Sequence, residues 1–417
     1  GILEKLDYLI ELGVTTIWVT PVYENIQNQD NSEPYHYYWP LNFEQMDRRL
    51  LDGTCLPNSV NMRTFGKFVD LCEARGIKVV LDMVVNHSGY GAQGEFDASW
   101  FNVGGSGDIK GELAGLPDFN HDNPEVLDFF INNIENWVSK GKVTNIRMDT
   151  VKHVEPKFWH YFKSQIRGEH PEVCLIDEVL FEGKDDVGKL LQYQNYHDFD
   201  SIFDFPLCTA LRSTLIFDES LNYWLARPRL NDDELPGILD DDNSFKGGYR
   251  NANKLVTLLD NHDLERRIMS HARTKHTGEG AGLDYAIRVV KLCLGALFTM
   301  RGIPQIYYGT EIQMSHPGTE SHGAIRAELP GGWRDHEANA FTGAGLDDRQ
   351  RAALDFTRTL LNWRKSADVV HNGRFMHFTP IGPVYAFFRY DEDDTIMVMF
   401  NHGEDAVELD LTRFTER

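Results

Sequence analysis

Short runs of β-branched and aromatic residues alternate with segments of helical periodicity along most of the chain. Before the first run, Leu3, Leu6, Leu9 and Ile10 fall on one face of a predicted helix. Seven runs have the length and composition of strands: residues 14–19, 77–85, 143–148, 173–176, 201–205, 255–259 and 303–307. Strands that alternate with helices in this way pair in parallel, with the helices as crossovers.

The number of strands selects the fold class. A closed parallel barrel needs eight strands, and the pattern supplies seven. The chain begins within a helical pattern that would follow a strand, so we expect an eighth strand before Gly1. We predict an α/β fold, a (β/α)8 TIM barrel whose first strand is missing from this chain. A doubly wound parallel sheet is the alternative.

Two intervals between strands are longer than a crossover requires. The first contains the aromatic loop 34–39 (PYHYYW). The second contains a glycine-rich stretch, residues 89–117, and then a predicted helix over 124–137. We interpret the second interval as a lid insertion at about residues 88–120.

The apolar period changes to two after about Asn372. Residues 373–378, 384–388 and 395–400 alternate as strands of an antiparallel sheet do. We therefore predict two domains, a barrel with its lid over residues 1–371 and a C-terminal β domain over residues 372–417. We expect this second domain to be incomplete.

The composition of the chain limits the classes of molecule that it is expected to bind. Among 417 residues there are 41 Lys and Arg against 64 Asp and Glu, a formal net charge of −23. That balance disfavours binding to a phosphate backbone or an anionic membrane, and no apolar run is long enough to cross a bilayer. The odd number of cysteines, five, leaves at least one thiol without a partner in the chain, and their spacing matches no metal motif. We expect a neutral polar substrate, no nucleic acid and no membrane.

Polar side chains gather where the predicted strands end. They are Asp82, Asn86, His87, Arg147, Asp149, Glu178, His262 and Asp263. In a parallel barrel these ends form the face that carries the active site. Buried carboxylates without partners are costly, so fold stability alone explains such a set poorly. A network of structural salt bridges is the alternative for any single member.

The sequence surroundings of these residues suggest a different chemical role for each carboxyl group. Arg147 and Asp149 are two positions apart on a strand and point to the same face, where the guanidinium keeps the carboxylate ionised as a nucleophile. Glu178 follows an apolar run, and burial there would raise its pKa and suit a general acid. Such a pair is what retaining glycoside cleavage requires, and Asp263 adds a further negative charge for the cationic transition state.

These residues lie in segments that resemble the four ordered signature regions of the α-amylase superfamily. The segments are 82–87 (DMVVNH), 147–153 (RMDTVKH), Glu178 and 261–263 (NHD). The stretches 116–120 (LPDFN) and 302–309 (GIPQIYYG) agree with the same superfamily. Residues 330–333 (PGGW), 339–341 (NAF) and 373–378 (GRFMHF) resemble the bacterial cyclomaltodextrinase and neopullulanase-like branch. The resemblance covers essentially the whole chain.

The resemblance implies a role for each site residue. Asp149 would be the nucleophile, Glu178 the acid/base and Asp263 the transition-state stabiliser. Substrate contacts would come from Tyr38, which stacks on the sugar, His87 and His262, which bind its hydroxyls, Arg147, which orients Asp149, and Lys152 on the leaving side. Ordinary core packing of the histidines and tyrosine, and a solvated lysine, are the alternatives.

The resemblance also implies a structural Ca²⁺ ion and no organic cofactor. Its ligands would be Asn86, Asp118 and the backbone carbonyl of His153, with Asp108 and Glu112 as additional candidates. Simple hydrogen bonding of the lid to the barrel by Asn86 and Asp118 is the alternative.

Three positions depart from the family pattern, which usually has glycine at each. They are Tyr37, Asn145 and Asp177. We expect Tyr37 to narrow the sugar site. Asp177 should point away from Glu178, because neighbouring residues of a strand face opposite sides.

The expected function is hydrolysis of α-1,4-glucosidic bonds in starch-type glucans, maltooligosaccharides or cyclodextrins by double displacement. Thr150 and Val151, after the expected nucleophile, resemble the α-1,4-cleaving members. Transglycosylation through the same intermediate and a non-catalytic amylase-like carbohydrate-binding protein are the alternatives. A polymeric substrate favours a secreted or periplasmic location.

Overall fold

The computed structural model describes residues 1–27, 35–50, 58–195, 197, 199–226, 237–239, 248–277, 280–316, 318–319, 321–333 and 335–415. Pro34 of the predicted aromatic loop and Cys55 lie outside these residues. The other four cysteines are free thiols, and three of them are buried. No helix in the described ranges is both long enough and apolar enough to span a membrane.

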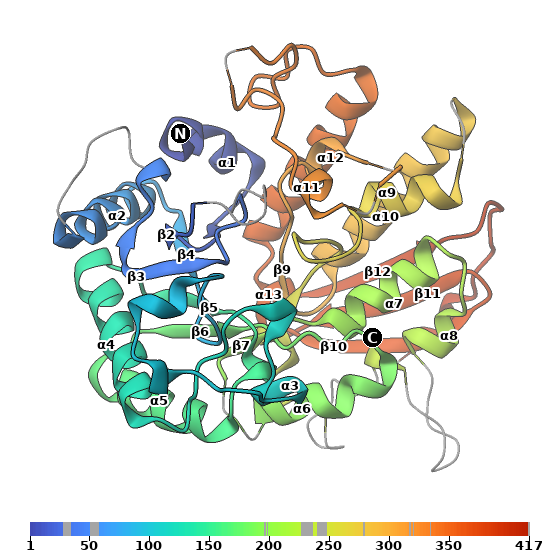
Figure 1. Cartoon of the computed structure of the whole chain (residues 1–417). Helices are drawn as coiled ribbons and strands as arrows, with labels where there is room; N and C mark the ends of the chain where they lie inside the picture. Colours follow the sequence, from blue (N-terminus) through green and yellow to red (C-terminus); the bar gives the residue numbers. More distant parts are fainter. Residues whose placement is uncertain are drawn as a thin grey trace.

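Seven parallel strands form the centre of the molecule, as predicted, and all but β6, which is shifted by one residue, are shorter than their predicted runs (Figure 1). They are β1 (Thr16–Val19), β4 (Lys78–Met83), β5 (Asn145–Met148), β6 (Cys174–Asp177), β7 (Ser201–Ile202), β8 (Val256–Thr257) and β9 (Ile303–Pro304). The first five pair in this order, β8 pairs with β9, and a parallel bridge between Phe203 and Val256 joins the two groups. The strand order therefore never reverses, which excludes the doubly wound alternative.

The sheet is open on one side. Among the described residues no ladder connects β9 to β1. The helical layer, in contrast, is continuous at this place, because α12 (Asp348–Ser366) packs directly against α1 (Leu6–Leu12). The two helices approach so closely that a Cβ on Gly13 would lie 2.8 Å from the Cβ of Leu361.

The remaining helices surround the sheet or extend from it. They are α2 (Asn58–Glu73), α3 (Gly107–Lys110), α4 (Pro124–Gly141), α5 (Pro156–Glu169), α6 (Val187–Asn195), α7 (Phe205–Leu215), α8 (Leu221–Trp224), α9 (Ile268–Lys275), α10 (Ala281–Thr299), α11 (His322–Ile325) and α13 (Asp368–Asn372). Successive helices pack on one another, α2 on α4, α4 on α5, and α10 on α12. The first predicted helix is only partly correct, because Leu3 lies in a 3₁₀ turn and is 40% exposed.

Helix α4 shows how the sequence positions a strand that carries site residues. The side chain of Asn123 caps its first turn by accepting a hydrogen bond from the Glu125 amide, and Pro124 occupies the first helical position. Phe130, Ile134 and Trp137 are buried on its inner face. After Lys142 ends the helix in the left-handed conformation, the chain enters β5. The helix therefore fixes where β5 starts.

The excursion after β4 leaves the barrel and returns beside its point of departure. It contains the 3₁₀ helices η3 (Ala92–Glu95), η4 (Ala98–Trp100) and η5 (Leu113–Gly115) as well as α3. An antiparallel bridge between His87 and Asp118 holds its two ends together, and a second one, between Phe101 and Phe119, joins its middle to its returning end. The hairpin of β2 (Tyr23–Asn25) and β3 (Pro40–Met46) supplies Phe43, which packs against Phe96 and Phe119 of this excursion.

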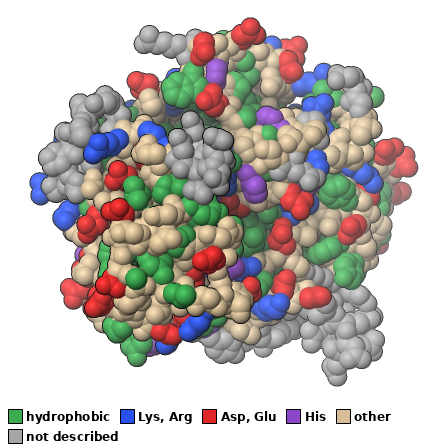
Figure 2. All heavy atoms as spheres, viewed as in Figure 1, with side chains coloured by type: hydrophobic (Ala, Val, Ile, Leu, Met, Phe, Trp, Pro, Cys, Tyr) green, Lys and Arg blue, Asp and Glu red, His purple; other side chains and the backbone are tan. Residues whose placement is uncertain are grey.

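A separate antiparallel sheet follows, as the change of period predicts (Figure 1). It consists of β10 (Arg374–Ile381), β11 (Val384–Tyr390) and β12 (Thr395–Asn401). The buried Arg389 on β11 donates to the side chain of Asn253 at 2.9 Å and to the carbonyl of Val370 at 3.0 Å. These bonds tie the sheet to the barrel. On the face of the molecule in Figure 2, acidic side chains are spread widely and form no single patch.

Candidate active site

The ends of three neighbouring strands carry the polar cluster. Asp82 on β4 is the register partner of Arg147 on β5. Asp149 and Glu178 each come just after a strand, and their amides extend the ladder by donating to the carbonyls of Met83 and Met148 at 2.9 and 3.0 Å. The backbone pairing therefore fixes the direction in which both carboxylates leave the sheet.

Arg147 lies at the centre of the cluster and is 1% exposed. Its Nη1 donates to Asp82 Oδ1 at 3.0 Å and to Asp149 Oδ1 at 2.5 Å. Its Nη2 lies 2.7 Å from Glu178 Oε1 and 3.8 Å from Asp263 Oδ2. Four carboxylates thus share one guanidinium. An excess of negative charge in a buried site favours protonation of the member that is least well compensated.

Glu178 is that member. Burial, and then the neighbouring Asp149 and Asp263, raise the pKa of Glu178 to about 8, although Arg147 acts in the opposite direction. Its Oε2 accepts a hydrogen bond from the amide of Thr150 at 3.0 Å. The apolar run before Glu178 predicts that this residue is buried, and the structure confirms it, because Glu178 is 6% exposed. Glu178 therefore holds a proton at neutral pH.

Asp263 has the opposite electrostatics. Burial alone would raise the pKa of Asp263, but His262, Arg147 and Arg326 outweigh burial and hold this pKa well below its usual range. His262 Nε2 lies 3.0 Å from Asp263 Oδ2, and Arg326 donates to Oδ1 at 3.0 Å. Asp263 therefore remains ionised beside a carboxyl group that remains protonated.

An aromatic wall borders the cluster. The hydroxyl of Tyr38 donates to Asp82 Oδ2 at 2.5 Å and lies 2.8 Å from His262 Nε2, while the two rings stack with their centroids 5.4 Å apart. His87 is 3% exposed, and its Nε2 lies 3.1 Å from the carbonyl oxygen of Tyr38. Burial lowers the pKa of His87, which favours the neutral imidazole. Trp18 closes this side by donating to Asp82 at 3.0 Å.

Lys152 lies on the loop after β5, next to the cluster in sequence. Its Nζ donates to the carbonyl of Leu180 at 3.0 Å and lies 5.2 Å from the centre of the Phe181 ring. The structure therefore places Lys152 on the loop that follows Glu178, without an ion pair to the four carboxylates among the described residues. Asp177 is completely buried, and burial raises its pKa. The cations that most strongly oppose this rise are Lys163 and Arg167 of α5, which indicates that Asp177 faces the helices, as expected.

Tyr37, where the family has glycine, adopts a φ of +67°. This left-handed conformation is unfavourable for a residue with a Cβ. The half-buried ring lies under the guanidinium of Arg49, 5.3 Å from its centroid. No ring or ion-pair contact among the described residues joins Tyr37 to the four carboxylates around Arg147. The contacts of Tyr37 therefore give no support to the expected narrowing of the sugar site.

Two substitutions separate the strain at Tyr37 from the value of its ring. Tyr37→Ala keeps a Cβ at positive φ and removes the ring, whereas Tyr37→Gly removes both. We expect the glycine variant to be more stable than the alanine variant by about 1 kcal/mol, since glycine relieves the left-handed strain. Urea unfolding of the two variants measures this difference. An alanine variant as stable as the glycine variant would contradict the assignment of strain.

The residues expected to bind calcium lie where the excursion rejoins the barrel. Asn86 Oδ1 and Asp118 Oδ1 are buried and have no hydrogen-bond partner among the described residues. The other Asp118 oxygen accepts from Asn102 Nδ2 at 2.8 Å, and the His153 ring lies 2.7 Å from the carbonyl of Asp108. Two orphaned oxygen atoms suit a hard cation. No group of three His, Cys, Asp or Glu side chains in the described part of the chain is arranged to hold a metal.

The sequence did not reveal every member of the cluster. Arg326 contacts Asp263 from a loop between β9 and α12, and no local pattern distinguishes it from other arginines. Trp18 had a local signal, because it is a tryptophan with a polar ring nitrogen near the end of the first predicted strand. Asp82 was expected at a strand end, but its bonds to Tyr38 and Trp18 depend on the tertiary fold.

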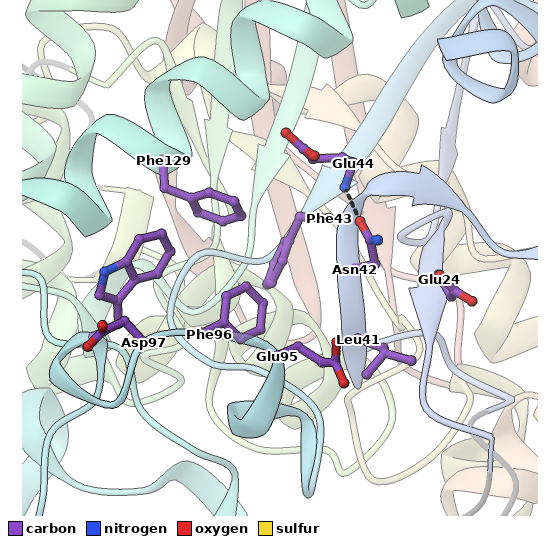
Figure 3. A pocket seen from close by; sticks show the side chains of 10 residues that line it. Glu24, Leu41, Asn42, Phe43, Glu44, Glu95, Phe96, Asp97 and Phe129 are labelled. Carbon is purple, nitrogen blue, oxygen red and sulfur yellow. Dashed lines mark hydrogen bonds between the residues drawn. The ribbon is translucent and has the colours of Figure 1, made fainter. Parts of the chain in front are cut away.

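A pocket lies outside this cluster (Figure 3). Its volume is about 460 Å³, and residues of β2, β3, η3, η4 and α4 and their adjoining loops line it. Four aromatic rings and four carboxylates line it, and none of the residues expected at the active site is among them.

Comparison with known proteins agrees with this geometry. The family model for the α-amylase catalytic domain matches residues 1–102 and 109–371, and the model for the cyclomaltodextrinase C-terminal domain matches residues 375–417. A cyclomaltodextrin glucanotransferase of Klebsiella oxytoca is 25% identical over 465 residues, covering 97% of this chain and 64% of that protein. A cyclomaltodextrinase of a Bacillus species is 24% identical over 434 residues, covering 97% and 65%.

Solved structures show the same likeness. An α-amylase from Geobacillus thermoleovorans, complexed with acarbose, is 26% identical with a TM-score of 0.75, covering 96% of this chain and 80% of that one. The cyclomaltodextrin glucanotransferase CldA is 25% identical with a TM-score of 0.75, covering 97% and 79%. The chain spans just under two thirds of the length of its first curated relatives. Its strand order, its C-terminal sheet and both family matches lead to one conclusion: this chain belongs to the α-amylase family.

Proposed function

We propose that this chain is a retaining glycoside hydrolase that cleaves α-glucosidic bonds by double displacement. The observation that carries the proposal is the pair of carboxyl groups on one guanidinium. Asp149 and Glu178 contact the two Nη atoms of Arg147, and the pKa of Glu178 is raised to about 8. A nucleophile and an acid on neighbouring strands stand close together, as the retaining reaction requires.

Each group has a defined task in this reaction. Asp149 attacks the anomeric carbon while Glu178 donates its proton to the departing glycosidic oxygen, which leaves a covalent glycosyl ester on Asp149. Glu178, now ionised, removes a proton from a water molecule that attacks the same carbon and releases Asp149. The ionised Asp263 lies 3.8 Å from Nη2 of Arg147, the nitrogen that Glu178 also contacts, and stabilises the positive charge that develops on the sugar.

The aromatic wall supplies the sugar site. We assign to Tyr38 the stacking face and to His87 and His262 the hydrogen bonds to sugar hydroxyls, because these three side chains are held together beside the carboxylates. Lys152, anchored on Leu180 next to Glu178, contacts the sugar on the leaving side. Arg147 orients Asp149.

The relatives named above are by their names a cyclomaltodextrin glucanotransferase, a cyclomaltodextrinase and an α-amylase, which supports α-1,4-glucans as the substrate class. Residues 1–371 would form the catalytic barrel, with residues 88–120 as its lid, and 372–417 a separate domain. The family matches, which end at residue 371 and begin again at residue 375, support this division. A polymeric substrate supports a secreted or periplasmic location.

The configuration of the first product tests the proposal. Soluble starch and a cyclodextrin should both release reducing ends, and proton NMR in the opening minutes should show the α-anomer first. A β-anomer appearing first would refute the covalent intermediate. No release from either substrate, with retained binding, would favour a non-catalytic carbohydrate-binding protein instead.

Transglycosylation is a second candidate, because glucanotransferases are among the relatives. A sugar hydroxyl can replace water in the second step without any change of residues. Products longer than a maltooligosaccharide substrate would reveal it.

Calcium is expected to stabilise the fold through Asn86, Asp118 and the His153 carbonyl, where two buried oxygen atoms have no described partner. Adding Ca²⁺ to chelator-treated protein at about 100 times its Kd should add about 2.7 kcal/mol of stability and raise the Tm. Asp118→Asn should abolish this response. Asp122→Asn, which changes a nearby exposed carboxylate paired with Lys110, should retain it. A Tm that is independent of calcium would contradict the site.

A further inference from the structure

Arg326 reaches the active site from a part of the chain that carries none of the expected site residues. It lies just after α11, in the segment between β9 and α12. Its Nη2 donates to Asp263 Oδ1 at 3.0 Å, and its Nε donates to the carbonyl of His262 at 3.1 Å. The guanidinium thus holds both the side chain of one residue and the backbone of its neighbour.

These bonds complete the restraint of the Asp263 carboxylate. His262 Nε2 lies 3.0 Å from Oδ2, so that each oxygen has one close partner. Arg147 is farther away, at 3.8 Å, and is shared with three other carboxylates. The Asp263 side chain is 27% exposed, so without Arg326 its Oδ1 would be free to turn toward water. A carboxylate that must face a cationic transition state acts best when its orientation is fixed beforehand.

Arg326 is itself held in place. Its side chain is only 14% exposed, and its guanidinium carbon lies 5.8 Å from the centre of the Tyr35 ring. The hydroxyl of Tyr308 donates to the carbonyl of the next residue, Ala327, at 2.9 Å. The buried Arg267 in turn donates to the carbonyl of Tyr308 at 2.6 Å. The segment therefore presents Arg326 on a supported backbone.

We propose that Arg326 is a positioning residue that fixes the carboxylate of Asp263 in the orientation needed for the transition state. The proposal rests on the proposed function, because the need for this orientation arises from the glycosidic reaction. A purely structural arginine, which only attaches the β9–α12 segment to the barrel, is the competing explanation. The two differ in whether the effect of Arg326 depends on Asp263.

A double-mutant cycle distinguishes them. In wild-type protein, Arg326→Gln should lower kcat about tenfold to a hundredfold and change KM by no more than about threefold, as expected for a misplaced group acting in the transition state. In the Asp263→Asn background the same substitution should lower kcat by less than about twofold, because the residue it positions has lost its charge. Arg326→Lys, which keeps the charge but loses the fork, should fall between Arg326→Gln and wild type.

Arg349→Gln is the matched control. Arg349 Nε donates to Asp284 Oδ1 at 2.7 Å in an exposed pair away from the cluster, so its loss should leave kcat unchanged. Thermal unfolding of each variant verifies that it is folded. If Arg326→Gln does not fold, Arg326→Lys replaces it in the double-mutant cycle.

Three results would overturn the proposal: an unchanged kcat in Arg326→Gln, an equal loss in both backgrounds, or a change in KM alone. If the wild-type protein cleaves no glucan, the proposed function fails. The contact between Arg326 and Asp263 is then tested separately by carbon-13 NMR of the Asp263 carboxyl group. Its titration midpoint should rise in Arg326→Gln relative to wild type. An unchanged midpoint would overturn the inference there as well.

Discussion

Asp149→Asn is expected to lower kcat by at least about a thousandfold, or roughly 4 kcal/mol of barrier at 1.36 kcal/mol per factor of ten. The substitution removes the nucleophilic charge and preserves the shape of the side chain. It also removes one of four carboxylates around Arg147, so the cluster keeps an excess of negative charge and the protein should remain folded. Initial rates on a maltooligosaccharide measure the loss, and calorimetric titration should show that binding of the same sugar persists.

Asp185→Asn controls for the chemistry of the substitution, because Asp185 is exposed and lies in the connection between β6 and α6. It should retain the wild-type rate. An Asp149→Asn variant with more than about a tenth of the wild-type kcat would remove Asp149 from the role of nucleophile, since a tenfold loss corresponds to only 1.36 kcal/mol.

The core of the site was predictable because strand geometry is regular. Arg147 and Asp149 are two positions apart, and the period of a strand places their side chains on one face, where the structure shows them hydrogen-bonded. Parallel strands also end at one edge, which brings Asp82 and Glu178 to the same place. The fold class followed from the same regularity, since seven alternating units leave few architectures.

Other features depend on tertiary contacts that no local pattern encodes. Arg326 and Asp263 are 63 residues apart, and helices α9 and α10 and strand β9 lie between them, so no local spacing predicts that they meet. The pKa of Glu178 is raised partly by Asp149 and Asp263, which meet it only in the folded chain. The strands β8 and β9 are shorter than their apolar runs, and β9 pairs on only one side among the described residues.

The exposure of Leu3 and the conformation of Tyr37 show the limits of pattern reasoning in two different ways. The helical spacing of Leu3 is regular, yet the first turn is a 3₁₀ helix and lies at the surface. Tyr37 has a positive φ that its residue type disfavours, so the surrounding contacts and not its propensity determine the backbone there.

Glu178→Gln is expected to impair unactivated maltooligosaccharides by about 10²- to 10⁴-fold, the usual contribution of a general acid. An aryl glycoside whose leaving group needs no proton should lose far less in the first step. The pH dependence follows from the pKa of about 8. In wild-type protein kcat/KM should fall as the pH rises above about 8, where the free enzyme loses the catalytic proton. Rates between pH 5 and 10 on both substrates test this.

The same substitution should change stability in a defined direction. The pKa of Glu178 is higher in the folded chain than the ordinary value near 4.5, so the folded state binds more protons over the interval up to about pH 8. Its favourable contribution is therefore present at low pH and is lost as the pH rises through that interval. Glutamine does not ionise, so the unfolding free energy of the Glu178→Gln variant should decline less than that of wild type between pH 5 and 8.

Glu311→Gln separates the catalytic effect from the general effect of a buried acid. Glu311 is 3% exposed, accepts a hydrogen bond from Tyr8 at 2.7 Å, and has a pKa raised by burial, but it lies outside the cluster. The control should alter the dependence of stability on pH and leave the basic limb of kcat/KM intact. If Glu178→Gln instead lost equal activity on both substrates, the proton would have to come from another group. Asp177 would be tested first, although it faces the helices and would have to reorient to reach the sugar.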